Sequence, residues 1–191
     1  MRNQTKVFSS TFPARLIRAF LVLLVCYGAV LADDPVDSLD RSLPLRAAFL
    51  NHFRSFVNWP APFGSRKTTQ YCFLEKRSEL AEEFRDSIYK LYGNKSNVKI
   101  LKVSSVAELT SCHIAYFGEY LPGDSLKELS SLSNLPVLTV GSGEDFLQNG
   151  GILRFFEEGN RLRFEIHLEQ AKKQDLRISP DLLKLARIYS P

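Results

Sequence analysis

The sequence predicts an α/β fold: a three-layer α/β/α sandwich whose mostly parallel sheet is extended by a C-terminal antiparallel hairpin. Two observations support this prediction. Between residues 71 and 140, short apolar runs alternate with amphipathic helical segments, an order typical of βαβ units with helices on both faces of a sheet. Residues 153–168 then change to a two-residue apolar periodicity, which is typical of a half-buried antiparallel hairpin.

The first 32 residues predict a secretory signal peptide. They carry four basic residues and no acidic one, and their apolar run from Ala19 to Leu31 is shorter than the roughly 20 residues of a membrane-spanning helix. Val30 and Ala32 stand at positions −3 and −1 of a small-residue cleavage site, so we expect cleavage before Asp33 and export to the periplasm. An uncleaved membrane anchor is the alternative.

The excess of positive charge belongs to this leader. The full chain has 25 basic and 21 acidic residues, and removal of the four basic residues of the leader leaves 21 of each. The mature chain is therefore close to neutral, and we expect no nucleic-acid partner. Residues 33–191 have the length of one domain and contain no repeat, so a single α/β domain is expected.

An aromatic helix is expected at the start of this domain. Residues 33–40 are acidic and predict a loose N-terminus; Pro44 suits the first turn of the helix, and Pro60 prevents its continuation beyond Trp59. Its apolar positions recur at steps of three and four residues: Leu45, Ala48, Phe49, Phe53, Phe56 and Val57. Aromatic residues in such a pattern are more often core residues than ligands.

The elements of the predicted sheet follow in order. Strands are expected at four apolar runs: Tyr71–Leu74, Val98–Val103, Cys112–Phe117 and Val137–Val140. Helices are expected from Ser78 to Gly93 and at residues 125–132, with at most one helical turn at residues 106–109. Ser179-Pro180-Asp181 is a typical helix start, and it predicts a last helix with Leu182, Leu185, Ala186 and Tyr189 on one face.

The hairpin is the most specific structural prediction. Gly159-Asn160 suits a two-residue turn with positive φ, and this turn determines the register. The predicted pairs are Phe155 with Phe164, Leu153 with Ile166, Arg154 with Glu165 and Glu158 with Arg161, with Leu168 on the apolar face. A slip by one residue would destroy both the apolar and the charged pairs.

Motifs for catalysis or metal binding are weak. Gly141-Ser142-Gly143 follows a strand, but Phe146 replaces the third glycine of a dinucleotide-binding turn and no phosphate-binding lysine follows. His52, His113 and His167 are far apart in the sequence, and His113 lies in the most apolar strand, where we expect a buried, hydrogen-bonded side chain. We therefore expect no enzyme activity, no metal and no cofactor.

The polar face of the hairpin is a candidate ligand site. Arg154, Arg163, Glu165 and His167 share this face, which could bind an anion or a partner protein, and His167 would make such an interface respond to mild acid. The alternative is a solvated face with a cross-strand ion pair worth less than about 1 kcal/mol.

Two cysteines remain after the leader, Cys72 and Cys112. In an oxidising compartment we expect them to form one disulfide, and closing this loop of about 40 residues would stabilise the fold by about 4 kcal/mol in the chain-entropy treatment. Two buried free thiols are the alternative.

Three segments of the chain resemble the YfiR family of periplasmic regulatory proteins. They are residues 45–60 (LRAAFLNHFRSFVNWP), residues 109–119 (LTSCHIAYFGE) and residues 135–188. The more specific matches are Val57-Asn58-Trp59-Pro60, Cys112, the run from Pro136 through Gly150-Gly151 to Phe164-Glu165-Ile166, and Leu176-Arg177-Ile178-Ser179 with Leu182-Leu183.

The resemblance implies a small α/β sandwich that acts by protein–protein contact. Members of the family repress a diguanylate cyclase of the inner membrane by binding its periplasmic domain, and an OmpA-like outer-membrane lipoprotein sequesters the repressor, which raises cyclic di-GMP. Related domains are input modules of histidine kinases. Cys72 and Cys112 match a family disulfide, whereas a second cysteine pair of some members is missing here, with Phe146, Leu147 and Leu153 at or near its positions. This absence argues for a disulfide that stabilises the fold.

Two functional hypotheses follow. The first is a partner-binding regulator, which predicts an exposed apolar patch either on the outer face of the hairpin or around Phe56, Trp59, Pro60 and Phe63. The second is a small-molecule-sensing domain for a histidine kinase or another membrane signalling protein, with an anion held by Arg154, Arg163 and His167. The partner and the oligomeric state, a homodimer included, stay open.

Overall fold

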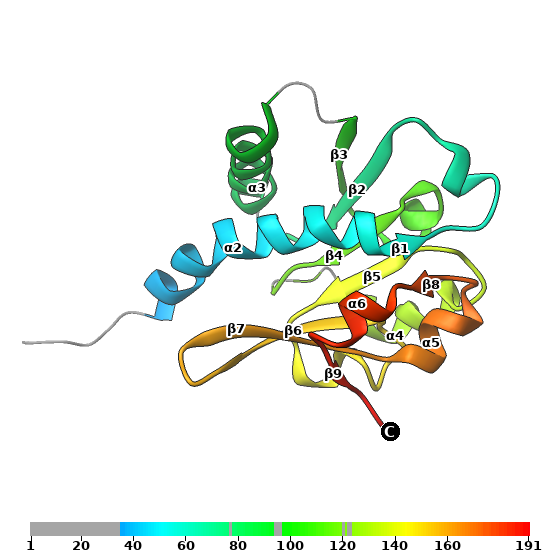
Figure 1. Ribbon diagram of the computed structural model, residues 1–191. Helices are drawn as coiled ribbons and strands as arrows, with labels where there is room; N and C mark the ends of the chain where they lie inside the picture. The colour runs from blue at the N-terminus through cyan, green and yellow to red at the C-terminus, as the bar shows by residue number, and fades with distance from the viewer. Residues whose placement is uncertain (1–34, 77, 94–96, 120, 122–123) are drawn as a thin grey trace, which may run out of the picture. The chain divides into compact units, whose positions relative to one another are not determined.

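A seven-stranded sheet is the central layer of the structure, with the strand order β3-β2-β4-β5-β6-β7-β9 (Figure 1). Its strands are β2 (Thr69–Leu74), β3 (Val98–Val103), β4 (Ile114–Phe117), β5 (Leu138–Gly141), β6 (Leu153–Glu158), β7 (Arg161–Ile166) and β9 (Arg187–Ile188). Neighbouring strands from β3 to β6 are parallel, β6 and β7 form an antiparallel hairpin, and β9 runs parallel to β7. The predicted α/β class is confirmed, with its mostly parallel sheet and C-terminal hairpin.

The computed structural model describes residues 35–76, 78–93, 97–119, 121 and 124–191. The predicted signal peptide and its cleavage site lie outside these residues. Contacts within the chain separate Met1–Asp37 from Ser38–Pro191, and the sheet belongs to the second unit. Within the described ranges, no helix combines the length and the apolar character needed to cross a bilayer.

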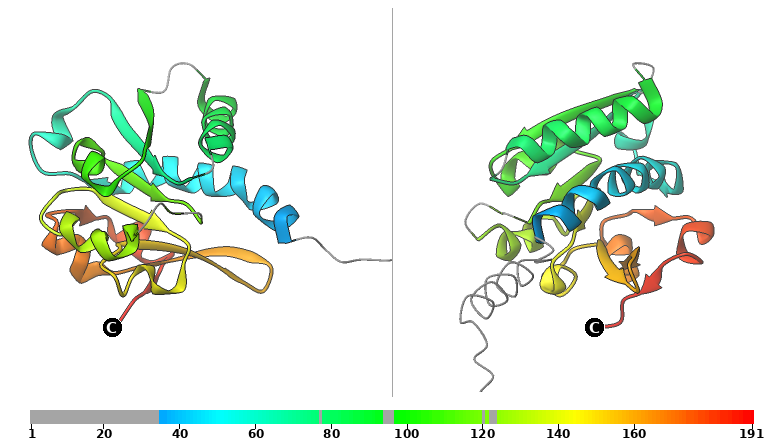
Figure 2. Two further views of the ribbon diagram at one scale, coloured as in Figure 1. Left: turned by 180° about the vertical axis from the view of Figure 1, so that it is seen from behind. Right: turned by 90° about the vertical axis from the view of Figure 1, so that its left-hand side faces the viewer.

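Both faces of the sheet are buried, because alternate residues of one strand enter different hydrophobic cores. On β2, Tyr71 and Phe73 belong to the first core, whereas Cys72 and Leu74 belong to the second. The first core is covered by α2 (Pro35–Phe56), α3 (Ser78–Tyr92), α5 (Leu168–Lys173) and α6 (Pro180–Leu183). The second is covered by the 3-10 turns η3 (Val106–Ser111), η4 (Leu129–Leu132) and η5 (Glu144–Phe146) with α4 (Ser125–Glu128). Figure 1 looks onto the side of α2, and the left view of Figure 2 onto the side of α4.

Helix α2 begins and ends earlier than predicted. It starts at Pro35, so most of the segment expected to be a loose N-terminus is helical, and Pro44 lies inside the helix. An interior proline removes one backbone hydrogen bond, but Leu43 and Ala47 on either side of it are buried in the first core and hold the helix. The helix ends at Phe56 because the next residues form the short strand β1 (Val57–Asn58).

The hairpin has the predicted turn and register. Gly159 and Asn160 have φ angles of +56° and +59°, as a type I′ turn requires. All four predicted pairs are present: Phe155 with Phe164, Leu153 with Ile166, Arg154 with Glu165 and Glu158 with Arg161. The strand ends at Ile166, however, so the prediction that His167 and Leu168 continue its alternation is wrong. Both residues belong to the start of α5, which the two-residue periodicity had concealed.

The C-terminal helix is shorter than predicted. Ser179 is its N-cap, as expected, since its hydroxyl accepts the N–H of Asp181. The helix stops at Leu183 and the chain turns back as β9, which leaves Leu185 69% exposed. Tyr189 donates its N–H to the carbonyl of Ile166 at 2.9 Å, so pairing with the open edge of β7 overrides the helical periodicity.

Candidate functional site

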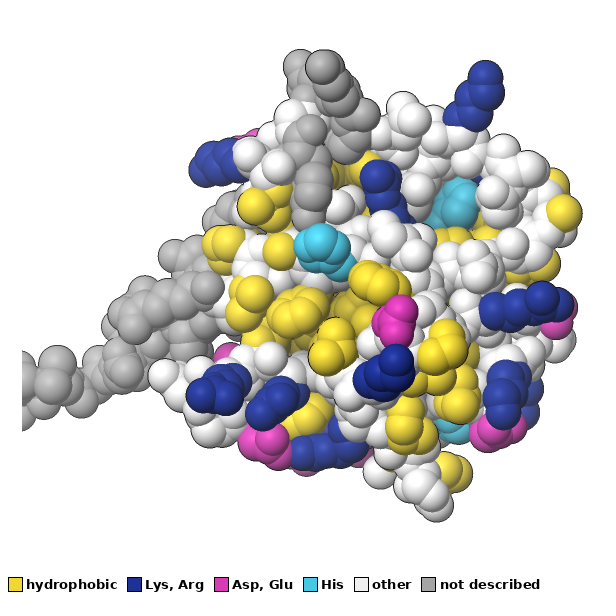
Figure 3. All heavy atoms as spheres, in the orientation of Figure 1, with side chains coloured by type: hydrophobic (Ala, Val, Ile, Leu, Met, Phe, Trp, Pro, Cys, Tyr) yellow, Lys and Arg dark blue, Asp and Glu magenta, His cyan; other side chains and the backbone are white. Residues whose placement is uncertain are grey.

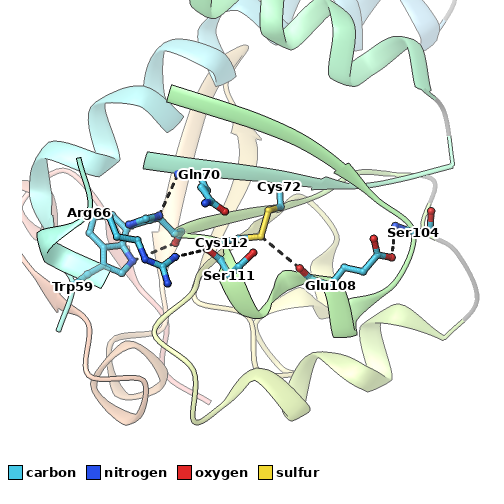
Figure 4. The surroundings of a disulfide bond; sticks show 9 residues. Trp59, Arg66, Gln70, Cys72, Ser104, Glu108, Ser111 and Cys112 are labelled. Atoms are coloured by element: carbon cyan, nitrogen blue, oxygen red, sulfur yellow. Dashed lines mark hydrogen bonds between the residues drawn. A yellow bond between two sulfur atoms is a disulfide. The ribbon is translucent and has the colours of Figure 1, made fainter. Parts of the chain in front are cut away.

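The disulfide joins strand β2 to the residue that ends η3. Cys72 of β2 and Cys112, two residues before β4, are bonded with their Cα atoms 6.0 Å apart, and both residues are fully buried. The predicted disulfide is therefore confirmed, and the alternative of two free thiols is wrong. Figure 4 shows the bond between Cys72 and Cys112, with Gln70, Arg66 and Trp59 to one side of it. A disulfide is typical of proteins outside the cytoplasm and is consistent with an extracytoplasmic location.

His113, the residue after Cys112, is buried and bonded through both ring nitrogens. Its Nδ1 accepts the backbone N–H of Gln70 at 3.1 Å, and its Nε2 lies 3.1 Å from the carbonyl oxygen of Phe63. Because Nδ1 accepts, the proton of the neutral ring is on Nε2, which donates to Phe63. Only 4% of the residue is exposed, which confirms the expectation of a satisfied buried histidine.

Residues 59–66, here named the aromatic loop, are built around His113. The rings of Trp59 and Phe63 each lie 5.6 Å from the imidazole in edge-on geometry. Trp59 Nε1 also donates to the main-chain carbonyl of His113 at 3.3 Å. The guanidinium of Arg66 lies over the Phe63 ring at 4.1 Å and donates to the carbonyl of Ser111 at 2.9 Å. Residues at both ends of the aromatic loop, Trp59 and Arg66, are thus bonded to the segment that leads into β4.

The backbone of the aromatic loop is tightly folded. Gly64 donates its N–H to the carbonyl of Pro60 at 3.0 Å, and the peptide bond between Ala61 and Pro62 is cis. A Cβ atom at Gly64 would lie 2.4 Å from the carbonyl oxygen of Trp59, so no larger residue fits there without a shift of the backbone. The position of Trp59 is therefore determined by main-chain packing as well as by its ring contacts.

A groove of about 500 Å³ lies beside the aromatic loop, and we name it the Trp59 groove. One wall consists of Asn58, Trp59 and Pro60, and the other of Lys172, Asp175, Leu176 and Arg177 from the end of α5 and the start of β8 (Arg177–Ile178). Strands β1 and β8 pair antiparallel, with Asn58 opposite Arg177, and hold the two walls together. The groove therefore offers a half-buried indole on one side, and on the other two basic side chains with the carboxylate of Asp175.

The two basic side chains of the groove differ in whether they form an ion pair. Lys172 pairs with Glu169 at 2.8 Å. Arg177 is exposed, and no carboxylate of the described residues lies within ion-pair distance of it. Arg177 is therefore available to a carboxylate of a bound molecule.

The four residues predicted to bind a partner have different surroundings. Trp59 and Pro60 line the groove, whereas Phe63 lies in the aromatic loop against His113. Phe56, at the end of α2, packs from outside against the first core. Apolar side chains gather on the face of α2 and α6 that Figure 3 shows, and those of these helices that stay partly exposed while packed on the first core are Phe49, Phe56 and Leu183.

Both arginines of the predicted ligand site are paired with glutamates of the hairpin. Arg154 and Glu165 form an ion pair at 2.8 Å, and Glu165 is only 5% exposed. Arg163 lies 3.7 Å from Glu158, a residue that also binds Arg187. Their charges are therefore largely neutralised within the hairpin.

His167, unlike the other three residues of the predicted ligand site, lies outside the hairpin strands and is the N-cap of α5. Its Nδ1 accepts the N–H of Gln170 as the N-cap of that helix, and its ring lies 5.0 Å from that of Tyr189. Burial lowers the pKa of His167 below its ordinary value, and the cation of Lys173 adds to this, while Glu169 opposes it.

The Gly141-Ser142-Gly143 segment, considered above as a phosphate-binding turn, has a structural role. A Cβ atom at Gly141 would lie 2.6 Å from the ring of Phe146, and Ser142 accepts a hydrogen bond of 2.6 Å from the buried Arg46 of α2. The segment also lines a cavity of about 250 Å³ at the carboxyl ends of β4 and β5. Among the described residues, no three His, Cys, Asp or Glu side chains are close enough to bind one metal ion.

Sequence reasoning missed the second wall of the groove. Lys172 and Asp175 belong to α5 and the turn after it, and α5 was not predicted. Arg177 lies in the Leu176–Ser179 run that resembles the family, and this run is the one signal that could have identified it.

The comparison with known protein families covers most of the chain. The model of the YfiR/HmsC-like family matches residues 44–187. This range includes both disulfide cysteines, the aromatic loop, both walls of the Trp59 groove and the hairpin. The match extends over much more than half of the 191 residues. The chain therefore belongs to the YfiR/HmsC-like family.

Proposed function

We propose that the protein is a non-enzymatic periplasmic regulator that binds the periplasmic domain of an inner-membrane diguanylate cyclase and represses it. The family suggests a regulatory role. The observation that carries the proposal is the Trp59 groove, which is lined by a rigidly held indole and by the exposed Arg177. Tryptophan and arginine are among the residues that most often dominate the binding energy of protein interfaces.

The rigidity of the aromatic loop supports a binding role. Trp59 is fixed by its bond to the His113 carbonyl and by its ring contact, so little conformational entropy remains to be lost on association. The groove suits an apolar or aromatic side chain against Trp59, with a neighbouring carboxylate that pairs with Arg177. Binding shifts the conformational equilibrium of the partner's periplasmic domain toward the conformation that fits the groove. Cyclic di-GMP falls as a result, and an OmpA-like outer-membrane lipoprotein that takes up the repressor would raise it again.

Trp59→Ala tests the proposal, with Leu91→Ala as the matched control. Leu91 lies on α3 outside the groove and is 52% exposed, so its removal also deletes an exposed apolar side chain. We expect Trp59→Ala to abolish co-purification with the membrane signalling protein and to raise cellular cyclic di-GMP, and Leu91→Ala to do neither. The proposal is wrong if a folded Trp59→Ala protein represses and co-purifies like the wild type.

A small-molecule-sensing domain for a histidine kinase or another membrane signalling protein is the second candidate. The volume of about 500 Å³ lies in the usual range of ligand pockets and favours it. The ligand would contact Trp59 and Arg177, or an anion would bind on the hairpin at Arg154, Arg163, Glu165 and His167. A thermal shift on addition of small anions or aromatic acids, lost in Arg177→Ala or in Arg163→Ala, would support this candidate over the first.

A further inference from the structure

We propose that His113 is a pH-sensitive latch that holds the aromatic loop, and with it one wall of the Trp59 groove, in the conformation that binds. The latch consists of the two ring hydrogen bonds of His113, to Gln70 and to Phe63. The regulatory meaning of the latch rests on the proposed function, because it assumes that the groove is the surface a partner contacts. The latch itself is a property of the isolated protein.

The hydrogen bonds of His113 require a neutral ring. Nδ1 accepts from the N–H of Gln70 at 3.1 Å, and Nε2–H donates to the carbonyl of Phe63, also at 3.1 Å. A protonated imidazole carries hydrogen on both nitrogens. Nδ1–H would then face the N–H of Gln70, so two donors would meet in a site where the histidine is only 4% exposed. Protonation therefore breaks the bond to Gln70 and moves the ring.

The aromatic loop is the part that must yield. On the strand side, Cys112 is the preceding residue, and its disulfide to Cys72 joins β2 to the segment that leads into β4. On the loop side, the ring centroids of Trp59 and Phe63 each lie 5.6 Å from that of the imidazole, in T-shaped geometry. Movement of the ring thus transfers to the indole that lines the groove rather than to the cross-linked strands.

The surroundings of His113 determine the direction in which its pKa is shifted. Arg66 is the charged side chain that acts on the ring; Gln70 on β2 and Ser111 at the end of η3 are neutral. Burial lowers the pKa of His113 most strongly, and the cation of Arg66 lowers it further, while the hydrogen bond to the Phe63 carbonyl raises it. The latch is therefore closed at neutral pH and opens only in acid, below the ordinary histidine value of about 6.5.

The tryptophan fluorescence of the protein provides the test, because Trp59 is the one tryptophan of the chain. We expect its emission to change in a single transition with a midpoint below pH 6.5 when the wild type is titrated from pH 7.5 to 4.5. His113→Asn, which keeps an acceptor toward Gln70 but does not titrate, should lose this transition. His167→Asn, which removes the titration of a second, partly buried histidine and retains a good N-cap residue, should keep it.

Two outcomes would overturn the latch: no transition in the wild type, or an unchanged transition in His113→Asn. If His113→Asn fails to fold, NMR of the wild type replaces it. The ring nitrogens of His113 should show the Nε2–H tautomer at pH 7.5. The amide signals of residues 63–66 should shift with the same midpoint pH as the titration of the His113 ring. Amide shifts that do not follow this titration reject the proposal. These measurements need no partner, so their failure leaves the Trp59→Ala test of the proposed function untouched.

Discussion

The backbone N–H of Ser179 donates a hydrogen bond of 2.8 Å to the carbonyl of Phe56. This bond continues the pairing of β1 with β8, in which Val57 lies opposite Ile178. It thereby ties the end of the aromatic helix to the C-terminal segment that carries Arg177. The Trp59 groove exists because these two distant parts of the chain meet here.

Arg177→Ala should weaken binding of the proposed partner domain by about thirtyfold, equivalent to about 2 kcal/mol, because its exposed guanidinium at the groove is suited to bind a carboxylate. Lys172→Ala is the matched control, since that lysine is already paired with Glu169, and it should change the Kd by less than about threefold. Titration calorimetry with the purified periplasmic domain measures both. Equal losses in the two variants would contradict a specific role of Arg177.

Gly64→Ala should destabilise the aromatic loop, because its Cβ would lie 2.4 Å from the Trp59 carbonyl oxygen. We expect a loss of about 1–3 kcal/mol in the free energy of unfolding and a shift of the Trp59 emission maximum. Gly143→Ala is the control, since a Cβ there has no neighbour within 4 Å. Urea unfolding followed by fluorescence separates the two variants, and a Gly64→Ala protein as stable as Gly143→Ala would refute the packing argument.

Loss of the disulfide should lower the free energy of unfolding by about 2–5 kcal/mol, because the Cys72–Cys112 bond closes a long loop in the unfolded chain. The double variant Cys72→Ala with Cys112→Ala should unfold at a lower urea concentration than the wild type. Adding reductant should shift the wild type toward the variant and leave the variant unchanged. A reductant-insensitive wild type would contradict this account.

Removal of Arg154 should be costly because it leaves the carboxylate of Glu165 buried without its partner. Arg154→Met is expected to cost about 3 kcal/mol of stability, and the double variant with Glu165→Gln should recover part of this loss. The exposed pair of Lys184 and Asp181 serves as the comparison, and Lys184→Met should have little effect. Additive losses for Arg154 and Glu165 would show that the pair does not act as a unit.

The stability of the protein should decrease in mild acid. The folded-state pKa values of His113 and His167 are both lowered, chiefly by burial, whereas in the unfolded chain both titrate near 6.5. Below this value the unfolded state binds more protons, so the stabilisation is complete above pH 6.5 and is lost as the pH falls through the folded-state pKa values. Urea unfolding at a series of pH values measures the loss. His113→Asn with His167→Asn should flatten the profile between pH 6.5 and 5; an unchanged profile would assign the loss to other groups.

Local patterns were sufficient for the central strands and the hairpin of the fold, although not for α5 or the short strands β1, β8 and β9. The hairpin register followed from Gly159-Asn160, because a two-residue turn and an alternating strand leave one pairing that buries the apolar face. The N-cap at Ser179 and the apolar strand at Ile114–Phe117 were equally predictable, since capping and burial on both faces depend on neighbouring residues. The pairing of Cys72 with Cys112 needed only the expectation of an oxidising compartment.

What the sequence by itself determined is therefore the order of the main helices and strands from α2 to β7, the register of the hairpin and the resemblance to the family. Tertiary structure alone decided the end of α2, the strand at Arg187–Ile188 and the groove, because each depends on backbone groups of distant segments finding partners in one another. The same holds for His113, whose two ring bonds reach Gln70 and Phe63 on different segments. No periodicity within one segment records such a contact.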